Sequence, residues 1–530
     1  MQALVKDHIE KVLELNNLVL EKPKDISLGH YATPVAFSLA KELRKNPMLI
    51  AQELADKFKD SQIFDSVTAV KGFVNFRLSN SFLEELTSKL FDDEANFAKG
   101  ENQNQKILLE YVSANPTGPL HIGHARGAIF GDTLARVGKH LGYDITTEYY
   151  INDAGSQMDM LGLSVSLAGR EFLLNEKVEY PESYYRGEYL IDIAKEIQKN
   201  LGDEIFNDES RFREMASFAK DEVLKIIEKD LKDIGIEFDN YVSENSLYPS
   251  WEETKRVLEN NGSLYEKDEK IFLKSTAHGD DSDRVVVRDN GIPTYLAGDI
   301  IYHKHKYDRN FDKYINIWGA DHHGYITRVK AAIEFLGNDS SKLEIILSQM
   351  VQLLKGGEPY KMSKRKGNFI LMSDISEEIG SDALRFVFLT RKSDTHLEFD
   401  LETLKNQDSS NPVFYINYAH ARINQVFKKA NLTVNDVKDE KLDVLNEDAI
   451  NLVYEALLLP SVLNEAFEKR DMQKITDYLY FLASSVHKFY NEHKVLETDN
   501  QNSYLKVLAV VSLSIRTGLR LLGIEAKEVM

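Results

Sequence analysis

The sequence predicts an α/β fold built on a doubly wound parallel sheet, preceded by an α+β domain and followed by an all-helical bundle. Three observations carry this prediction. Strand and helix patterns alternate from residue 106 onward, short helical and β-prone runs mix in residues 1–100, and helical patterns dominate from residue 382 to the end. We therefore expect domains at 1–100 and 106–385, a connecting stem at 386–408, and a bundle at 409–530.

The central segment begins with an apolar β-prone run at 107–112. A helical pattern follows at about 122–141, then a second strand at 144–150 and a long helical stretch from 153. A strand–helix–strand order of this kind predicts a parallel, Rossmann-like sheet. Residues 181–260 are charged and mostly helical, and we expect an insertion at about 181–280. Further strand candidates lie at 285–287, 314–318 and 343–349.

The two flanking segments have different patterns. Residues 4–19 and 34–58 have apolar residues at helical spacing, and 67–70 and 73–78 are short β-prone runs, so 1–100 reads as a small α+β domain. A polar stretch at 94–105 is typical of a linker. In 409–530 only Pro412 and Pro460 interrupt a helical pattern that is poor in glycine, which predicts a bundle.

Composition excludes several classes of protein. Apolar residues make up 43% and charged residues 28% of the 530 residues, as in ordinary globular chains. Without cysteine there is no disulfide, thiolate zinc site, iron–sulfur cluster or cysteine nucleophile. The longest nearly apolar stretch, 507–515, is far shorter than the roughly 18 residues of a membrane span. The charged N-terminus argues against a signal peptide, so we expect a cytoplasmic protein without membrane contact.

The net charge of −20 is unevenly distributed. Residues 1–100 and 409–530 each carry −2, and residues 101–408 carry −16. If the protein binds a polyanion, the two end segments are therefore the better docking surfaces.

The most informative segment runs from Ser113 to His124 and ends in His121-Ile-Gly-His124. It lies between a predicted strand and a predicted helix, where doubly wound folds bind phosphate on backbone N–H groups. Two imidazole donors there can stabilise charge on a phosphate. Taken alone, this four-residue motif is also compatible with the N-terminus of a helix that carries two surface histidines. No third ligand accompanies the two histidines, so we predict no metal site.

A second segment, Lys361-Met-Ser-Lys364-Arg-Lys-Gly-Asn368, follows Gly356-Gly357. Three lysines and an arginine within six residues stand out in the acidic middle of the chain. A cationic loop can clamp a triphosphate, although a solvated run of charges is the ordinary interpretation. The co-occurrence of the two segments favours the first interpretation.

With these two motifs the chain resembles the class I aminoacyl-tRNA synthetases, whose signatures are HIGH and KMSKS; only Arg365 departs from them. The flanking segments resemble the arginyl-tRNA synthetases of bacterial type, over the whole chain. These segments are 113–127, 149–155, 318–324, 382–385 and 417–422.

The resemblance implies ligation of L-arginine to the 3′-terminal adenosine of arginine tRNA through an arginyl-adenylate, with ATP as substrate and Mg²⁺ accompanying it. It further implies that activation requires bound tRNA, that residues 1–100 contact tRNA, that 409–530 is a DALR-type anticodon-binding domain, and that the protein is a monomer. The implied catalytic residues are His121, His124, Lys361 and Lys364, and the implied ATP contacts are Gly123, Gly319, Asp321, Met350 and Val351.

For arginine, the family match selects residues that can hold a guanidinium and the amino-acid end: Glu110, Ser113, Asn115, Glu244, Tyr295, Asp299 and His322. Tyr415, Tyr418 and Arg422 are the implied tRNA contacts, and Asp153 is expected to support the pocket. Without the resemblance, each of these acidic residues can be interpreted as an ordinary surface carboxylate, and each aromatic residue as part of the hydrophobic core. Three rival functions stay open: a small-molecule nucleotidylyltransferase, a non-catalytic tRNA-binding paralogue, and a class I lysine enzyme.

Overall fold

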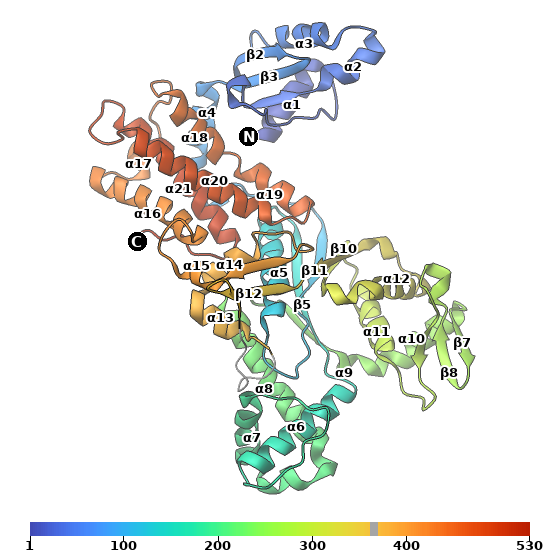
Figure 1. Ribbon diagram of the computed structural model, residues 1–530. Helices are drawn as coiled ribbons and strands as arrows, with labels where there is room; N and C mark the ends of the chain where they lie inside the picture. The colour runs from blue at the N-terminus through green and yellow to red at the C-terminus, as the bar shows by residue number, and fades with distance from the viewer. Residues whose placement is uncertain (361–368) are drawn as a thin grey trace. The chain divides into compact units, whose positions relative to one another are not determined.

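The computed structural model describes residues 1–360 and 369–530. It divides into two compact units, one of residues 100–406 and 470–473, the other of residues 1–99, 407–469 and 474–530 (Figure 1). Among the described residues, no helix combines the length and the apolar character needed to cross a membrane.

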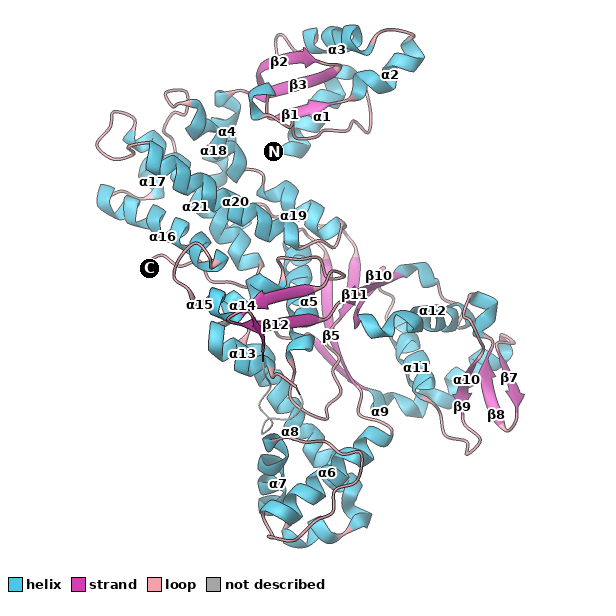
Figure 2. Ribbon diagram, in the orientation of Figure 1, coloured by secondary structure: helices cyan, strands magenta, loops and turns pink. Residues whose placement is uncertain are grey.

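A five-stranded parallel sheet forms the centre of the first unit, as predicted (Figure 2). Its order is β11-β10-β4-β5-β6, and each neighbouring pair is parallel. The strands are β4 (Lys106–Glu110), β5 (Asp144–Ile151), β6 (Asn240–Ser243), β10 (Lys313–Gly319) and β11 (Leu343–Ser348).

The strand order reverses at β4. The chain runs from β4 outward through β5 to β6 and returns on the other side of β4 as β10 and β11. In doubly wound sheets, ligands bind in the crevice at the carboxyl ends of the strands where the order reverses. Helix α5 (Ile122–His140) begins at this edge and connects β4 to β5.

The expected insertion at about 181–280 differs from the structure in one respect. Strand β6 lies inside that range and pairs with β5, so it belongs to the core sheet and divides the range in two. The strand has four residues and no buried position, which explains why no apolar run announces it. Before it lie α6 (Ser156–Phe172), α7 (Glu188–Leu201) and α8 (Phe212–Asp233). After it lie α9 (Glu244–Leu247), α10 (Trp251–Asn260) and an antiparallel sheet of β7 (Leu264–Lys267), β8 (Lys270–Leu273) and β9 (Arg284–Val287).

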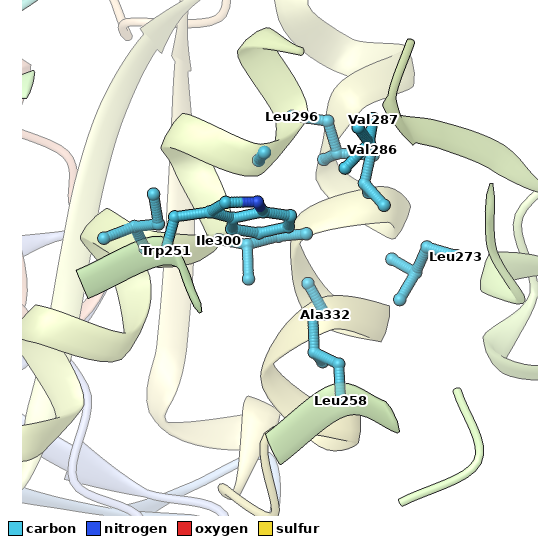
Figure 3. Close-up of a cluster of buried hydrophobic side chains, with 10 residues drawn as sticks. Trp251, Leu258, Leu273, Val286, Val287, Leu296, Ile300 and Ala332 are labelled. Carbon is cyan, nitrogen blue, oxygen red and sulfur yellow. The ribbon is translucent and has the colours of Figure 1, made fainter. Parts of the chain in front are cut away.

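Helix α11 (Tyr295–Asp308) is held by a hydrophobic cluster on one of its faces (Figure 3). Leu296 and Ile300 of α11 pack there with Trp251 of α10, Val286 of β9 and Ala332 of α12 (Ile326–Phe335). Burial of these side chains fixes the helix against its neighbours. The opposite face of α11 is thereby presented to the crevice of the parallel sheet.

The rest of this unit follows β11. It contains β12 (Val351–Lys355), β13 (Glu358–Pro359), α13 (Met372–Ile379), α14 (Ser381–Phe388), β14 (Leu397–Asp400) and α15 (Leu401–Lys405). Strand β12 pairs in parallel with β14 and antiparallel with β13.

The second unit combines the two ends of the chain. Its N-terminal part is α1 (Gln2–Leu13), α2 (Val35–Leu43), α3 (Pro47–Asp56) and α4 (Asn80–Asp92), with an antiparallel sheet of β1 (Tyr31–Thr33), β3 (Phe73–Leu78) and β2 (Phe64–Val70). Its C-terminal part is helical, as predicted: α16 (Pro412–Ala430), α17 (Val434–Val437), α18 (Glu447–Ala456), α19 (Leu459–Glu468), α20 (Gln473–Glu492) and α21 (Gln501–Leu521).

Candidate active site

The two histidines of the first motif form the N-terminal turn of α5. His121 is the N-cap, and its Nδ1 accepts the backbone N–H of Gly123 at 3.1 Å. The Nδ1 of His124 accepts the backbone N–H of His121 at 3.3 Å, and the rings stack with centroids 3.6 Å apart. Both rings therefore satisfy N–H groups that a helix start leaves free.

These hydrogen bonds determine what the histidines can offer a ligand. Burial lowers the pKa of His121 and lowers that of His124 to about 3, with a smaller contribution from the neighbouring His121. Both rings are therefore neutral at physiological pH. Because each Nδ1 accepts a hydrogen bond, the ring proton resides on Nε2. The pair presents two N–H donors and no net charge.

The segment that follows residue 368 is bonded to this helix start. The Ile122 N–H donates to the carbonyl of Ile370 at 2.9 Å, and the Met372 N–H donates to the carbonyl of Leu120 at 2.9 Å. Phe369 stacks on His121 with centroids 5.2 Å apart. The described chain thus resumes at Phe369 directly beside the histidine pair. Lys361 and Lys364 themselves lie outside the described residues.

Two cavities adjoin this edge of the sheet. A cavity of about 790 Å³ is lined by His121 and His124 together with the aromatic segment around Tyr185. A second cavity, of about 410 Å³, is lined from β4, β5, β10 and α11. Asn115 lines both cavities, so the loop after β4 lies at their junction.

Two carboxyl groups define the charge of the smaller cavity. Asp299 lines it and accepts a hydrogen bond at 2.7 Å from the hydroxyl of Tyr325. Glu244 lies against α11 beside it, with 3% of its surface exposed, and its Oε1 accepts the Tyr248 hydroxyl at 3.0 Å. The buried Oε2 of Glu244 has no hydrogen-bond partner among the described residues.

The environment strongly perturbs both carboxyl groups. Burial raises the pKa of Asp299 to about 7 against the opposing hydrogen bond from Tyr325, and the charge of Glu110 adds to the rise. Burial likewise raises the pKa of Glu244 to about 7, with the charge of Asp299 adding to it. A buried oxygen without a donor and two raised pKa values indicate a site that accepts a cationic ligand.

Comparison with known proteins agrees with this geometry. The family model described as tRNA synthetases class I (R), catalytic domain, matches residues 85–428. The arginyl tRNA synthetase N terminal domain matches 1–78, and the DALR anticodon binding domain matches 416–530. The chain belongs to the arginyl-tRNA synthetase family.

Individual relatives of this family match the full chain. The arginine–tRNA ligase of Aliarcobacter butzleri is 73% identical, and that of Campylobacter jejuni is 56% identical, each over 530 residues and 100% of both chains. A crystal structure of an arginyl tRNA synthetase from Campylobacter jejuni is 56% identical, with a TM-score of 0.83, and the match covers 86% of this chain and 100% of that one. The Thermus thermophilus arginyl-tRNA synthetase has a TM-score of 0.77 at 20% identity, covers 100% of both chains, and supports the fold alone.

Within this arginyl-tRNA synthetase, the smaller cavity collects most of the residues that the sequence selected for arginine. Its lining includes Glu110, Ser113, Asn115, Tyr295, Asp299 and His322, together with Gly319 from the predicted ATP set. Glu244 is not in the lining, and its carboxylate packs against Gly298 of α11. The other predicted ATP contacts at this edge, Asp321 and Met350, are exposed, and Val351 is half-buried.

Several residues of the cavity were not predicted from the sequence. Tyr302 and His303 line it, and Lys306 lies behind them, fully buried. These three follow Asp299 at spacings of three, four and seven, which place them on one face of α11. That spacing is the signal that could have revealed them.

Asp153 has a structural role, as expected. It accepts hydrogen bonds at 2.8 and 2.9 Å from the Ser243 hydroxyl, and at 2.9 Å from the Asn245 N–H. It therefore ties the loop after β5 to the end of β6, on both sides of Glu244 in the sequence.

The predicted tRNA contacts lie on α16 in the second unit. Tyr418 is 43% exposed, and Tyr415 packs on His487 with ring centroids 4.5 Å apart. The Arg422 guanidinium lies 3.9 Å from the centre of the Tyr490 ring. Among the three, Tyr418 has the most surface available to a base.

Proposed function

We propose that the smaller cavity binds L-arginine, that the carboxylate of arginine reacts with ATP beside the histidine pair, and that arginine tRNA accepts the product. The reaction of the family is arginine–tRNA ligation through an arginyl-adenylate, with release of AMP and pyrophosphate. The observation that carries the placement is the Asp299 carboxyl group in the lining of this cavity, with a Glu244 oxygen that has no partner among the described residues buried against the same helix.

Recognition of the guanidinium rests on these two carboxyl groups. A guanidinium is planar, permanently charged and carries five N–H donors, so it can engage two carboxylates at once. Binding of the guanidinium favours the ionised state of Asp299 and Glu244, and it therefore lowers the pKa values that burial has raised. A lysine ammonium has a different shape and fewer donors. Discrimination against lysine follows because buried carboxylate oxygens would be left without partners.

The amino-acid end of the substrate is assigned to the loop after β4. Ser113 and Asn115 lie there, and Asn115 faces both cavities. We assign His322 and Tyr295, at the rim of the same cavity, to the substrate as well. This arrangement directs the carboxylate of arginine toward the cavity of the histidine pair.

The ATP phosphates are assigned to the N-terminus of α5. His121 and His124 donate Nε2–H groups to the α-phosphate, and Lys361 and Lys364 act on the β- and γ-phosphates. A Cβ at Gly123 would lie 2.9 Å from ring atoms of His121, so glycine is needed there for the ring to keep its place. Catalysis then consists of positioning and charge stabilisation, without a covalent nucleophile from the protein.

The remaining ATP contacts are Gly319, Asp321, Met350 and Val351, which lie at the ends of β10 and β11. Mg²⁺ accompanies ATP through its phosphate oxygens, as is usual for this ion. We assign no protein ligand to it.

For tRNA, we assign contacts to residues 1–100 and to the anticodon-binding helices of 409–530, with Tyr415, Tyr418 and Arg422 among them. The protein acts as a monomer, and bound tRNA is required before arginine is activated.

Arginine-dependent exchange between ATP and pyrophosphate tests this proposal. We expect exchange when arginine and arginine tRNA are both present, and none when lysine replaces arginine. Exchange without tRNA would refute the requirement for tRNA while leaving the arginine site intact. Substitution of Glu244 by Gln should raise the arginine KM with little change in kcat. An unchanged KM in a folded variant would refute the assignment of the arginine site.

A further inference from the structure

A fully buried lysine lies behind the arginine cavity. Lys306 of α11 is 0% exposed and forms an ion pair with Glu110 at the end of β4. Its ammonium also donates to the Asn316 side-chain oxygen at 2.8 Å and lies 4.3 Å from the centre of the Tyr302 ring. Three partners around one ammonium compensate for the loss of its hydration.

The other oxygen of Glu110 holds the loop that leads to the histidine motif. Glu110 Oε1 accepts the Ser113 hydroxyl at 2.9 Å, and the Ser113 oxygen accepts the Tyr150 N–H at 3.1 Å. The backbone here is unusual, because Val112 has φ +67° and Ser113 has φ +42°. A β-branched residue rarely adopts a left-handed conformation, so surrounding contacts must maintain it.

A second set of hydrogen bonds runs from the Lys306 ammonium toward Asp299. His303 Nδ1 bonds the Asp299 backbone carbonyl at 2.8 Å, and its Nε2 bonds the side-chain nitrogen of Asn316 at 3.2 Å. Burial keeps His303 neutral by lowering its pKa to about 3. With its proton on Nδ1, His303 accepts from Asn316, and Asn316 accepts from the Lys306 ammonium, which also donates to Glu110. These hydrogen bonds connect the backbone of Asp299 to Glu110, and through it to the strained loop.

We infer that Glu110 and Lys306 are positioning residues, which hold the Val112–Ser113 turn and thereby set Ser113 and Asn115 against the amino-acid end of the substrate. This role replaces the guanidinium contact that the sequence suggested for Glu110. The inference rests on the proposed arginine site.

The charges lead to the same assignment. The carboxylate of Glu110 is matched by the ammonium of Lys306, so the pair contributes no net charge to the cavity. Both Glu110 oxygens are occupied, one by Lys306 and one by Ser113. Asp299 lines the cavity and accepts a hydrogen bond from Tyr325 alone among the described side chains, so it is the better receptor for a guanidinium.

The first test separates positioning from recognition. We expect Glu110→Gln to lower kcat for exchange by about 10-fold or more while changing the dissociation constant of arginine by less than about 3-fold. Asp299→Asn should do the reverse. If Glu110→Gln weakens arginine binding as much as Asp299→Asn and leaves kcat unchanged, Glu110 is a direct ligand and the inference is wrong.

The second test asks whether Glu110 acts through Ser113. In a double-mutant cycle, Glu110→Gln and Ser113→Ala should each lower kcat, and the double variant should be little worse than either one. If kcat of the double variant instead falls by the product of the two single-variant factors, the inference is wrong. The cycle uses the full chain with tRNA, and an inactive wild type would refute the proposed function instead.

A third variant guards against loss of folding. Lys306→Met leaves Glu110 without its partner, whereas Lys306→Met combined with Glu110→Gln removes both charges, a change that folded proteins tolerate better. The double variant should fold, keep the arginine dissociation constant within about 3-fold, and retain the low kcat. A wild-type kcat in the double variant would refute the inference. Lys304→Met on the same helix, at a lysine paired with Asp308, is the matched control.

Discussion

Gly298 determines how closely Glu244 can approach α11. A Cβ at this position would lie 2.4 Å from Glu244 Oε1 and 3.4 Å from the Tyr248 hydroxyl. Gly298→Ala must therefore displace the Glu244 carboxylate, even though alanine favours a helix over glycine by about 1 kcal/mol. The substitution should disturb the arginine site while leaving α11 intact.

The expected loss of arginine affinity follows from the strength of the hydrogen bond that the substitution would break. A hydrogen bond to a charged group is worth about 1.5–3 kcal/mol. Loss of one such bond between Glu244 and the guanidinium would weaken arginine binding about 10- to 150-fold, since about 1.4 kcal/mol corresponds to a factor of ten. The loss should be seen in the arginine KM, because the guanidinium lies away from the reacting carboxylate.

The assay is ATP–pyrophosphate exchange over a range of arginine concentrations, with circular dichroism to verify folding. Gly127→Ala in α5 is a matched control, because its Cβ would meet its nearest heavy atom, Ile317 Cγ2, at an ordinary 3.7 Å. A folded Gly298→Ala variant with a wild-type arginine KM would refute the role assigned to Glu244.

Three further predictions follow from the same structure. Because burial raises the pKa values of Asp299 and Glu244 to about 7, arginine should bind more tightly, and with release of protons, as pH rises from about 6 to 8, as titration calorimetry in two buffers can measure; a flat profile would contradict this. Because the pKa values of Asp299 and Glu244 are higher in the folded protein than in the unfolded chain, the folded protein without arginine binds more protons. The resulting contribution to the free energy of unfolding is complete below about pH 4 and is lost as the pH rises through about 7. Tyr325→Phe removes a donor to Asp299 and should move the midpoint of arginine binding to higher pH. Arg385→Met removes one of the two ion partners of the buried Asp132 and leaves Arg136, so it should lower the free energy of unfolding by about 1.5–3 kcal/mol in urea, and a change below about 0.5 kcal/mol would show that the Arg385 pair is not needed.

Much of the fold was predictable because its main strands are apolar and long. Strands β4, β10 and β11 are mostly apolar, and β5 ends in Tyr149-Tyr150-Ile151, so each carries a β-prone signal that can be seen in one sequence. Strand β6 escaped prediction because it is short and half-buried, and its place in the sheet depends on pairing with β5. Pairing between distant segments leaves no local pattern in one sequence.

Site residues could be predicted where a reactive residue type stands at a recognisable place in the predicted fold. The histidine motif could be found because it follows the first strand of the sheet, whereas Tyr295 and Asp299 were selected only by the family resemblance. Lys306 could not be found, because a buried lysine looks like any surface lysine until Glu110 is seen beside it. Its partner is separated from it by 196 residues.

The neutral histidine pair limits what the protein can do with a triphosphate. Two Nε2–H donors can bond phosphate oxygens, but they add no positive charge, since the Nδ1 atoms are committed to the backbone and burial keeps both rings neutral. The adjoining arginine cavity contributes acids. In the proposed reaction, positive charge for the developing pyrophosphate must therefore come from elsewhere, and Lys361 and Lys364, which follow β13 in the sequence, are its proposed source. The proposed division of roles, with neutral N–H donors on α5 and cationic lysines from residues 361–366, thus follows from the way the start of α5 is capped.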